Sequence, residues 1–327
     1  MIKLATAVVT ATALTISFAH AETRMDFSNE YPPSSIHAEG DSFFINQVNS
    51  LTDGDVDITL HTSGGLGFKS ADHFYAVADN AVQIADTLAG TLAGVNSIFL
   101  LSSLPFVADN VDQAEALYTI ARPYYEEVFE DNNQILLYAS PWPASGIWSK
   151  DEVTTVDALS DLKMRTYDKN GTITFKAAGA APVNLSWADV VPQLSTGAID
   201  GVLTSAESGV NGSFWEHLGH FSAIQYAIPL NMVHMNKEVF NNLDESMQAK
   251  ILEAAKLTDA HNWEEVRTRV KKNYIALAEH GIKTHTQMSP ELSALLKKSA
   301  TPAFDDWLAN TGDAGKEIMK QFNEVSQ

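Results

Sequence analysis

The hydrophobic and polar positions along the chain follow two alternating periods, and these periods predict most of its elements. Two-residue alternation in "TRMDFSNEYP" predicts a strand that ends at Pro32, and "IHAEGDSFFINQVNSLTDG" carries apolar positions at helical spacing up to Gly54. A second strand, "DVDITLHTSGGLG", precedes a helix with a strand-like exit, "SADHFYAVADNAVQIADTLAG". This order is typical of a parallel sheet with helices on both faces.

The same order resumes in the middle of the chain. "QILLYASPWPASGIWSK" predicts strands interrupted by Pro141 and Pro143. After it come a strand, a helix, a short strand, a second helix, and a strand that runs into a loop: "ALSDLKMRTYD", "NGTITFKAAGA", "APVNLS", "WADVVPQLSTGAI" and "DGVLTSAES". Two such modules, with no low-complexity linker between them, predict two α/β lobes.

The remaining pattern is helical. Residues 244–280 keep helical periodicity without an internal proline or glycine, and an unbroken helix of that length spans ~50 Å, enough to brace two small lobes. We therefore expect lobe I at 22–145 with a return of the chain at about 230–243, lobe II at 146–229, a long helix spanning the lobes at 244–281, and C-terminal helices at 282–327.

The N-terminus predicts export. The first 21 residues contain a single lysine, an apolar stretch from Leu4 to Phe18, and Ala19-His20-Ala21 as a small-x-small cleavage site. That stretch is shorter than the ~20 residues that cross a bilayer. The chain has no cysteine, so it has no disulfide framework and no lipid-anchored cysteine. We expect a soluble periplasmic protein of a Gram-negative bacterium, cleaved near Ala21.

Charge and motifs exclude several classes of function. The formal net charge is −20, and removing the signal removes one lysine and no acid, which makes it −21. Such a surface repels nucleic acid. The sequence has no nucleophile elbow, zinc-protease, P-loop or dinucleotide motif. His217 and His220, like His280 and His285, lack a third ligand nearby in sequence. We expect no metal, no cofactor and no catalytic residues.

One arginine stands out. Arg165 ends the alternation of a predicted strand and precedes the next helix, the position beyond strand ends where open α/β sheets bind ligands. A guanidinium there can hold a carboxylate or sulfonate with two parallel hydrogen bonds. A salt bridge to Asp168 or another acid would explain the same position. The other arginines have ordinary explanations, at the new terminus or in acidic helical stretches: Arg24, Arg122, Arg267 and Arg269.

The central segment also resembles a known family. "DLKMRTYD…AAGAAPVNLSWADVVPQLSTGAIDGVLTS" is similar to the DctP-type solute-binding subunits of tripartite ATP-independent periplasmic (TRAP) transporters, and the similarity extends over nearly the whole mature chain. The resemblance implies a two-lobed periplasmic binding protein fold with a ligand cleft between the lobes. It implies that Arg165 holds the substrate carboxylate, and that a small and a large membrane permease subunit are partners.

The resemblance has one departure. Thr204 stands where the family's "DGQEN" segment has a ligand-contacting asparagine, which argues against a C4-dicarboxylate or sialic acid as the substrate. The hydroxyls of Ser205 and Ser208 could meet ligand hydroxyls, although a solvated loop would explain them too.

Further ligand-binding candidates come from strand ends and large aromatic residues. Lys69 could supply a second cation, although an exposed lysine after a turn is common, and tryptophans are more often core residues than ligand contacts. The remaining candidates are Glu30, Tyr31, Asp86, Thr87, Trp142, Trp187 and Asn231.

The expected function is capture of a small organic acid anion without chemistry. The protein would close around the anion and deliver it to the permease. Two alternatives stay open on the sequence: a periplasmic enzyme acting on a small organic acid, and a ligand-presenting partner of a sensor kinase. We expect a monomer.

Overall fold

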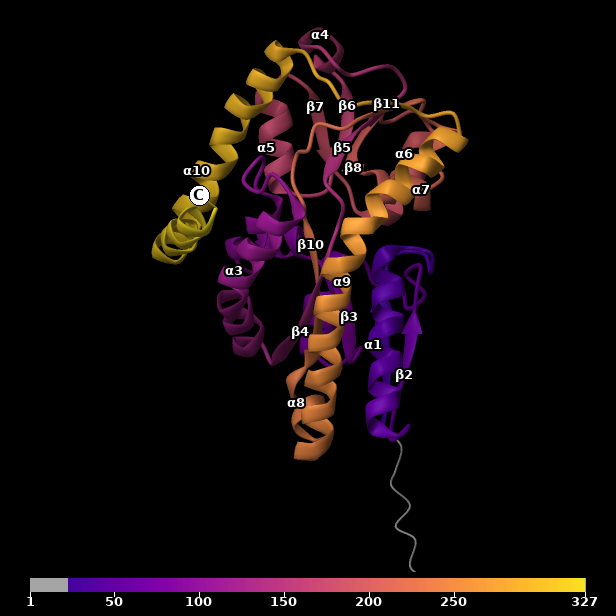
Figure 1. The fold of residues 1–327 in the computed structure, drawn as a ribbon, viewed down its shortest axis with the longest axis vertical. Helices are drawn as coiled ribbons and strands as arrows, with labels where there is room; N and C mark the ends of the chain where they lie inside the picture. The colour runs from indigo at the N-terminus through magenta and orange to yellow at the C-terminus, as the bar shows by residue number, and fades with distance from the viewer. Residues whose placement is uncertain (1–22, 327) are drawn as a thin grey trace, which may run out of the picture.

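The computed structural model describes residues 23–326, which form two lobes stacked along the long axis of the molecule (Figure 1). The predicted signal peptide lies outside the described residues. Each lobe is built on one mixed sheet, so the expectation of two α/β lobes is correct.

Lobe I contains a five-stranded sheet in the order β2-β1-β3-β10-β4. Its strands are β1 (Thr23–Asn29), β2 (Val56–His61), β3 (Ile84–Leu88), β4 (Gln134–Pro141) and β10 (Leu230–Asn236). Its helices are α1 (Ile36–Thr52), α2 (Ser70–Ala78), α3 (Val111–Asp131) and α8 (Lys237–Asn241), with 3-10 turns at Ala89–Gly94 and Ser97–Ser103.

Lobe II contains a six-stranded sheet in the order β11-β9-β5-β8-β6-β7. Its strands are β5 (Ser145–Ser149), β6 (Lys163–Thr166), β7 (Ala181–Asn184), β8 (Gly201–Ser205), β9 (His220–Ser222) and β11 (Lys283–His285). Its helices are α4 (Val156–Leu159), α5 (Lys169–Ala177), α6 (Trp187–Ser195) and α7 (Ala206–Asn211), with a 3-10 turn at Phe214–Glu216.

The sheets are mixed rather than wholly parallel, which corrects the expectation from the strand and helix order. β1 is parallel to β2 and β3, and β6 is parallel to β7 and β8. β10 is antiparallel to β3 and β4, and β5 is antiparallel to β8. The reason is topological: β5 and β10 begin at the lobe boundary after the chain has crossed it, whereas their neighbours end there.

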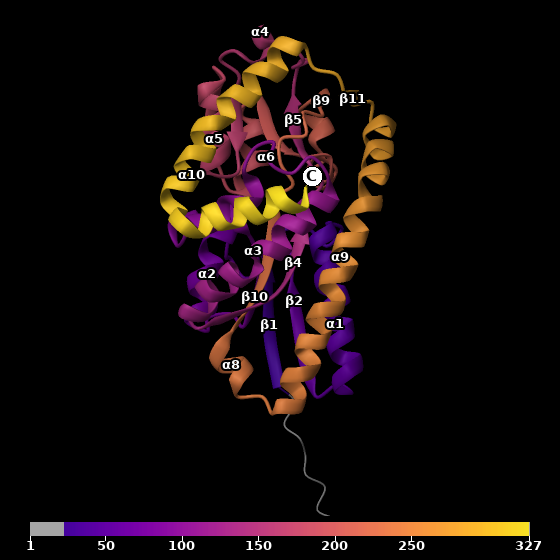
Figure 2. The same cartoon turned by 60° about the vertical axis from the view of Figure 1, so that its left-hand side comes forward.

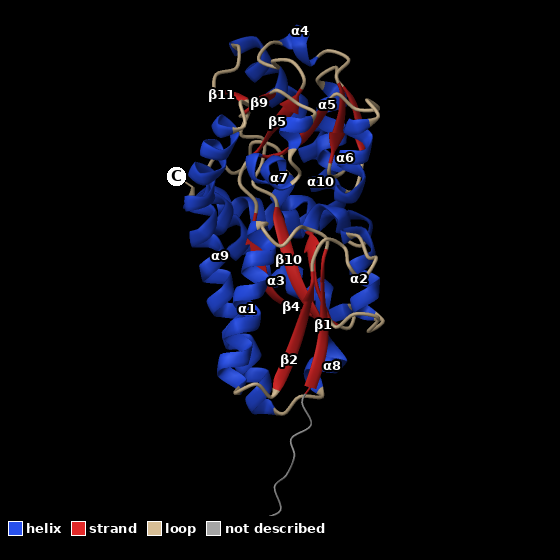
Figure 3. Ribbon diagram, turned by 90° about the vertical axis from the view of Figure 1, so that its right-hand side faces the viewer, coloured by secondary structure: helices blue, strands red, loops and turns tan. Residues whose placement is uncertain are grey.

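In this topology, strands of both lobes end at the boundary between the lobes. The carboxyl ends of β1, β3 and β4 in lobe I and of β6 and β8 in lobe II all meet at the lobe boundary, as the strands in Figure 3 show for lobe I. Open α/β sheets bind ligands beyond such ends. The fold therefore places residues from distant parts of the sequence around one gap.

Two long helices brace the lobes. α9 (Glu245–Glu279) starts at the capping side chain of Asp244, which accepts a hydrogen bond from the Met247 amide at 2.9 Å. It runs beside α1 along lobe I and continues past the boundary to lobe II (Figure 1). α10 (Pro290–Val325) packs on α5 and α3 and bends sharply at Gly312, whose φ of 60° and ψ of −128° break the helix (Figure 2).

The hydrophobic core is continuous across the boundary. One cluster of buried side chains joins Tyr31 and Trp142 of lobe I to Ile147 and Leu203 of lobe II. Each lobe also has a core of its own. The shared cluster surrounds the cavity described next.

Candidate functional site

A cavity with about 330 Å³ of space, open solvent included, lies between the lobes, at the strand ends. Side chains from both lobes line it. They are Tyr31, Leu88, Trp142, Ser145, Arg165, Tyr167, Trp187, Thr204, Ser205, Ser208 and Pro229. We call it the inner cavity.

Arg165 is the cation of the inner cavity. Its side chain is only 3% exposed, Nε donates to the Leu185 carbonyl at 2.9 Å, and Nη1 donates to the Leu203 carbonyl at 3.4 Å. These two carbonyls hold the planar fork in place while leaving Nη2 without a protein acceptor among residues 23–326. Burial lowers the pKa of Arg165, and the neighbouring Tyr31 and Glu30 oppose that shift.

The salt-bridge explanation of Arg165 does not describe this structure. Asp168 instead caps α5, because its carboxylate accepts a hydrogen bond from the Gly171 amide at 2.9 Å. In the described part of the chain no carboxylate forms an ion pair with Arg165. The guanidinium therefore faces the cavity with its charge uncompensated by a direct partner.

Aromatic rings form one wall of the inner cavity. Tyr31 makes an edge contact with Trp142, with ring centroids 5.0 Å apart, and lies 6.1 Å from Trp187. The Trp142 indole donates to the Asn231 side chain at 2.8 Å, which fixes the ring. Such a wall favours a ligand with a flat or apolar body.

Hydroxyl groups line another side. Thr204 is the last residue but one of β8, and Ser205, which ends the strand, caps α7 by accepting a hydrogen bond from the Ser208 amide at 3.1 Å. The segment after Ser205 was expected to be a loop, and it is the first turn of α7 instead. Its serines are thus held by helix geometry rather than by solvent.

A second cavity, with about 850 Å³ of space including open solvent, adjoins the inner one. We call it the outer cavity. It shares with the inner cavity the lining residues Leu88, Arg165, Tyr167 and Trp187.

Glu30 lines the outer cavity and is 7% exposed. Its Oε1 accepts a hydrogen bond from the Ser70 hydroxyl at 2.6 Å, and its Oε2 is buried without a partner in the described chain. Burial raises the pKa of Glu30, and hydrogen bonds from Ser70 and the charge of Arg165 oppose the shift. The site therefore carries an acceptor beside its cation.

Lys69 does not line either cavity. It precedes α2, and its ammonium forms an ion pair with Asp189 of α6 in lobe II at 3.0 Å. Both side chains are 45% exposed. This lysine bridges the two lobes at the surface, so the charge of Arg165 stands without Lys69 beside it in the cavity.

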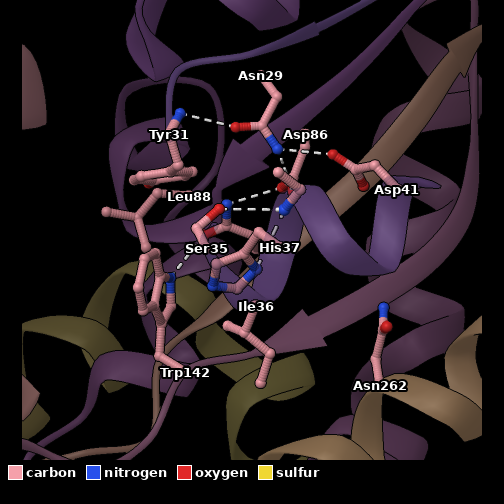
Figure 4. Close-up of polar contacts among 12 residues, drawn as sticks. Asn29, Tyr31, Ser35, Ile36, His37, Asp41, Asp86, Leu88, Trp142 and Asn262 are labelled. Atoms are coloured by element: carbon pink, nitrogen blue, oxygen red, sulfur yellow. Dashed lines mark hydrogen bonds and ion pairs between the residues drawn. The ribbon is translucent and has the colours of Figure 1, made fainter. Parts of the chain in front are cut away.

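Asp86, Thr87 and Asn231 line neither the inner nor the outer cavity, and Figure 4 shows Asp86 beside its hydrogen-bond partner Asn29. Asn231 accepts from Trp142 and donates to Asp86 at 2.7 Å, and Asn29 donates to both Asp86 and Asp41, at 3.2 Å and 2.6 Å. Burial raises the pKa of Asp86 to about 7. These groups support the wall through a buried hydrogen-bond network.

Thr87 belongs to a neighbouring buried set. Its hydroxyl lies 3.1 Å from Nδ1 of His73 and 2.8 Å from Nε2 of His234. Burial lowers the pKa of both histidines, that of His73 to about 4. Both imidazoles are therefore neutral and structural.

Sequence reasoning missed four residues of the inner cavity: Leu88, Ser145, Tyr167 and Pro229. Tyr167 could have been found, because residues two apart on an extended segment share a face and it follows Arg165 by two. Ser145 is the first residue of β5 and Pro229 directly precedes β10, so both lie where the chain has just crossed between the lobes, and no local pattern marks such crossings.

Other features of the described residues do not compete with this site. A larger groove along α10 is lined by Phe106, Ile224, Leu296 and Phe304, and its charged residues are exposed. Within residues 23–326 no group of three or more His, Asp or Glu side chains is arranged to hold a metal ion. In the same part of the chain, none of the helices combines the length and apolarity of a membrane span.

Comparisons with known proteins agree with this architecture. The family model described as bacterial extracellular solute-binding protein, family 7 (DctP), matches residues 27–310. The ectoine/5-hydroxyectoine-binding periplasmic protein UehA of Ruegeria pomeroyi is 24% identical over 280 residues, which is 82% of this chain and 80% of the relative.

Two solved structures have nearly the same fold. DctP6 of Bordetella pertussis, an extracytoplasmic solute receptor binding pyroglutamic acid, has a TM-score of 0.88 and 27% identity, with 92% of this chain and 100% of that chain covered. DctP7 of the same organism, also binding pyroglutamic acid, has a TM-score of 0.89 and 25% identity, with 92% and 99% covered.

Proposed function

The chain belongs to family 7 of the bacterial extracellular solute-binding proteins, the DctP-type receptors of TRAP transporters, and on that premise we propose that it captures a small organic acid in the inner cavity by the guanidinium of Arg165. The family and the similar structures are solute receptors, not enzymes. The function is therefore binding, and the question left to the site is which solute it selects.

The observation that carries the proposal is the state of Arg165. A guanidinium that is 3% exposed and has no carboxylate partner in the described chain is costly, because a buried charge is stable only when it is paired. Two backbone carbonyls orient the group and leave donors toward the cavity. A ligand carboxylate at this position would complete the ion pair and repay the desolvation of both charges.

The balance of charges favours a monoanion. Arg165 is the cation of the inner cavity, Lys69 is paired with Asp189, and Glu30 adds a carboxyl group nearby. A second carboxylate on the ligand would meet Glu30, and Lys169, the lysine that also lines the outer cavity, is already paired with Asp306. The unpartnered Oε2 of Glu30 instead suits a ligand N–H donor.

These features together favour a small ring that carries one carboxylate and one N–H group. Pyroglutamate, the ligand of DctP6 and DctP7, has this chemistry, with a flat lactam ring to lie against Tyr31, Trp142 and Trp187. We propose cyclic amino-acid-derived monocarboxylates of this kind as the substrate class. The protein would work in the periplasm as a monomer and pass the solute to the two membrane permease subunits.

The test is a ligand comparison on the mature protein. Thermal-shift assays and calorimetry would compare pyroglutamate with succinate, a dicarboxylate, and with the lactone 5-oxotetrahydrofuran-2-carboxylate, in which a ring oxygen replaces only the N–H. A ligand at about 100 times its dissociation constant should stabilise the fold by ~2.7 kcal/mol. We expect pyroglutamate to bind best. Tighter binding of succinate, or equal binding of the oxygen analogue, would contradict the proposed substrate class.

A further inference from the structure

α7 connects the inner cavity to a set of charged side chains on the far side of the same helix. Ser205 and Ser208 line the cavity, while Glu207 and Asn211, four residues apart and hence on one face, point to α1 and α9. Glu207 is 1% exposed. A buried carboxylate in a helix of lobe II needs partners, and lobe I and α9 supply them.

Arg269 of α9 is the main partner. Its Nε donates to Oε2 of Glu207 at 2.8 Å and its Nη2 to Oε1 at 2.9 Å, so the pair is bidentate. The same guanidinium donates to Glu39 at 2.8 Å and to the Ser34 carbonyl at 2.7 Å, both in lobe I. Arg269 therefore joins three parts of the molecule: α7, α9 and the start of α1.

Glu207 also holds lobe I directly. Its Oε1 accepts the Ile36 amide at 3.0 Å. Ile36 is the first residue of α1, and the first amides of a helix have no acceptor within the helix. A carboxylate of lobe II therefore helps to cap a helix of lobe I.

The capped turn of α1 packs against the aromatic wall of the inner cavity. His37, the next residue, lies with its ring centroid 3.9 Å from that of Trp142 and 5.5 Å from that of Tyr31. Figure 4 shows Ser35, Ile36 and His37 beside Trp142. The contact between α7 and α1 thus lies between the hydroxyl side and the aromatic side of the same cavity.

We propose that Glu207 and Arg269 are positioning residues of the binding site, which fix the spacing between its hydroxyl side on α7 and its aromatic wall on lobe I. Neither residue lines the cavity. Their effect on the ligand passes through α7 and the first turn of α1. This inference rests on the proposed function for its ligand readout, while its second readout needs no ligand.

The ligand-free readout is hydrogen exchange at the Ile36 amide in the full mature protein. Because Glu207 is the acceptor of this amide, loosening the contact should expose it to solvent. We expect Arg269→Ala and Glu207→Ala to accelerate exchange at Ile36 by at least about tenfold, while amides of β10 in the core exchange at the wild-type rate. Unchanged exchange at Ile36 in Arg269→Ala would overturn the proposal.

Arg267→Ala is the matched control. Arg267 lies on the same helix and pairs with Asp112 and Glu115 of α3, which belongs to lobe I, so it does not connect the lobes. Its removal should leave Ile36 exchange within about twofold of wild type. An equal acceleration in this control would mean general loosening of α9 and would contradict a positioning role.

The ligand readout uses pyroglutamate as the probe, with stopped-flow and calorimetry. Arg269→Ala should raise Kd by at least about tenfold, mainly through faster dissociation, because partners of buried charge pairs act on the dissociation rate. Arg269→Lys should recover part of the loss. A wild-type protein that ignores pyroglutamate would contradict the proposed substrate class alone, and Ile36 exchange would then decide the positioning role.

Discussion

At the scale of single residues, the site combines two buried groups of opposite charge, Arg165 and Glu30, that are not paired with each other by a hydrogen bond. Burial disfavours the charged form of both groups, so it lowers the pKa of Arg165 and raises the pKa of Glu30. Each group therefore gains from a ligand of matching chemistry, the arginine from a carboxylate and the glutamate from an N–H donor.

Arg165→Ala should weaken binding of the true ligand by roughly 30-fold to several thousand-fold, because truncating one partner of a desolvated charge pair costs ~2 to 5 kcal/mol. Arg165→Lys should recover only part, since an ammonium cannot form two parallel hydrogen bonds with one carboxylate. Calorimetry measures both. Arg122→Ala serves as the control, because Arg122 pairs with Glu126 away from the cavity. A loss below about threefold would remove Arg165 from the site.

Glu30→Gln should separate ligands by their N–H group. Glutamine keeps an acceptor oxygen but lacks the charge, so affinity for an N–H-bearing monoanion should fall by about tenfold, the difference between a charged and a neutral acceptor. Affinity for the analogue with a ring oxygen in place of the N–H should stay the same or rise, because glutamine does not repel the ligand carboxylate as the charge of Glu30 does. Parallel titrations of the two ligands test this. A uniform change for both would show that Glu30 does not distinguish them.

At the scale of elements, α7 shows how a short helix escapes sequence patterns. It spans only Ala206–Asn211, less than two turns, which is too short to show helical periodicity. The sequence predicted a strand running into a loop here, and the role of Ser205 as the helix cap became clear only from its contact with the Ser208 amide. The helix packs closely on lobe II through Gly209, which faces the buried ring of Trp148.

Gly209→Ala should destabilise the protein by ~1 to 3 kcal/mol, because its methyl group would overlap the Trp148 ring and force a shift in a close-packed core. Trp148 is fully buried and donates to the Ser205 carbonyl at 3.0 Å, so the ring cannot move freely. Urea denaturation provides the measurement. Gly94→Ala is the matched control, since nothing lies within 4 Å of its added methyl group. Equal stability of the two variants would contradict the close packing of α7.

At the scale of the whole molecule, the lobes meet through a shared apolar cluster and through two ionic contacts of different kinds. Lys69 and Asp189 are half exposed, whereas Arg269 and Glu207 are largely buried. Since solvent and salt screen exposed pairs, the first should add little to closure. The second lies where screening is weak.

Lys69→Met should weaken ligand binding by no more than about fivefold at low salt, since exposed ion pairs contribute 0.2 to ~1 kcal/mol. The difference from wild type should disappear in ~1 M NaCl, where the Debye length is ~3 Å. Calorimetry at two salt concentrations is sufficient. A large loss that persists at high salt would mean that Lys69 contacts the ligand directly.

The stability of the fold should depend on pH through the buried carboxyl groups behind the aromatic wall. Burial raises the pKa of Asp86 from 3.8 to about 7 and that of Asp41 well above its ordinary value. The folded state therefore binds protons that the unfolded state releases. The stabilisation they give is complete below about pH 4 and is lost as the pH rises toward 7.

Asp86→Asn should flatten this pH dependence by an amount on the order of a few kcal/mol between pH 4 and pH 7. Urea denaturation at several pH values gives the slope. Asp79→Asn, at an exposed position, is the control and should keep the wild-type slope. An Asp86→Asn protein with an unaltered slope would show that Asp86 is ionised in the folded state.

Local patterns account for much of this architecture. Alternation in "LKMRTYD" and "DVDITLH" marked strands that the structure has as β6 and β2, and the helical period over 244–280 corresponds to α9. Arg165 was noticeable because it ended a strand, and it does line the inner cavity. The direction of the strands could not be predicted from local patterns, because β10 pairs with β3 and β4, which lie nearly 90 residues or more before it in the sequence.

Partners distant in sequence were beyond local reasoning. Arg269 was assigned to its helix neighbours, yet it pairs with Glu207 and Glu39. Likewise the spacing in the sequence paired His220 with His217 and His285 with His280. In the structure Nδ1 of His220 lies 2.9 Å from Nε2 of His285, on the adjacent strands β9 and β11. Such pairings depend on which strands adjoin, and no residue pattern within one element encodes that.

The sequence by itself determined the two α/β lobes, the long helix and the strand end that carries Arg165, because periodicity and capping act over a few residues. Only the tertiary structure decided which groups surround that arginine, that Lys69 pairs with Asp189, and that Glu207 of α7 contacts the first turn of α1. Those outcomes follow from the crossing of the chain between lobes, which brings distant strand ends and helix ends into contact through packing and desolvation of charge.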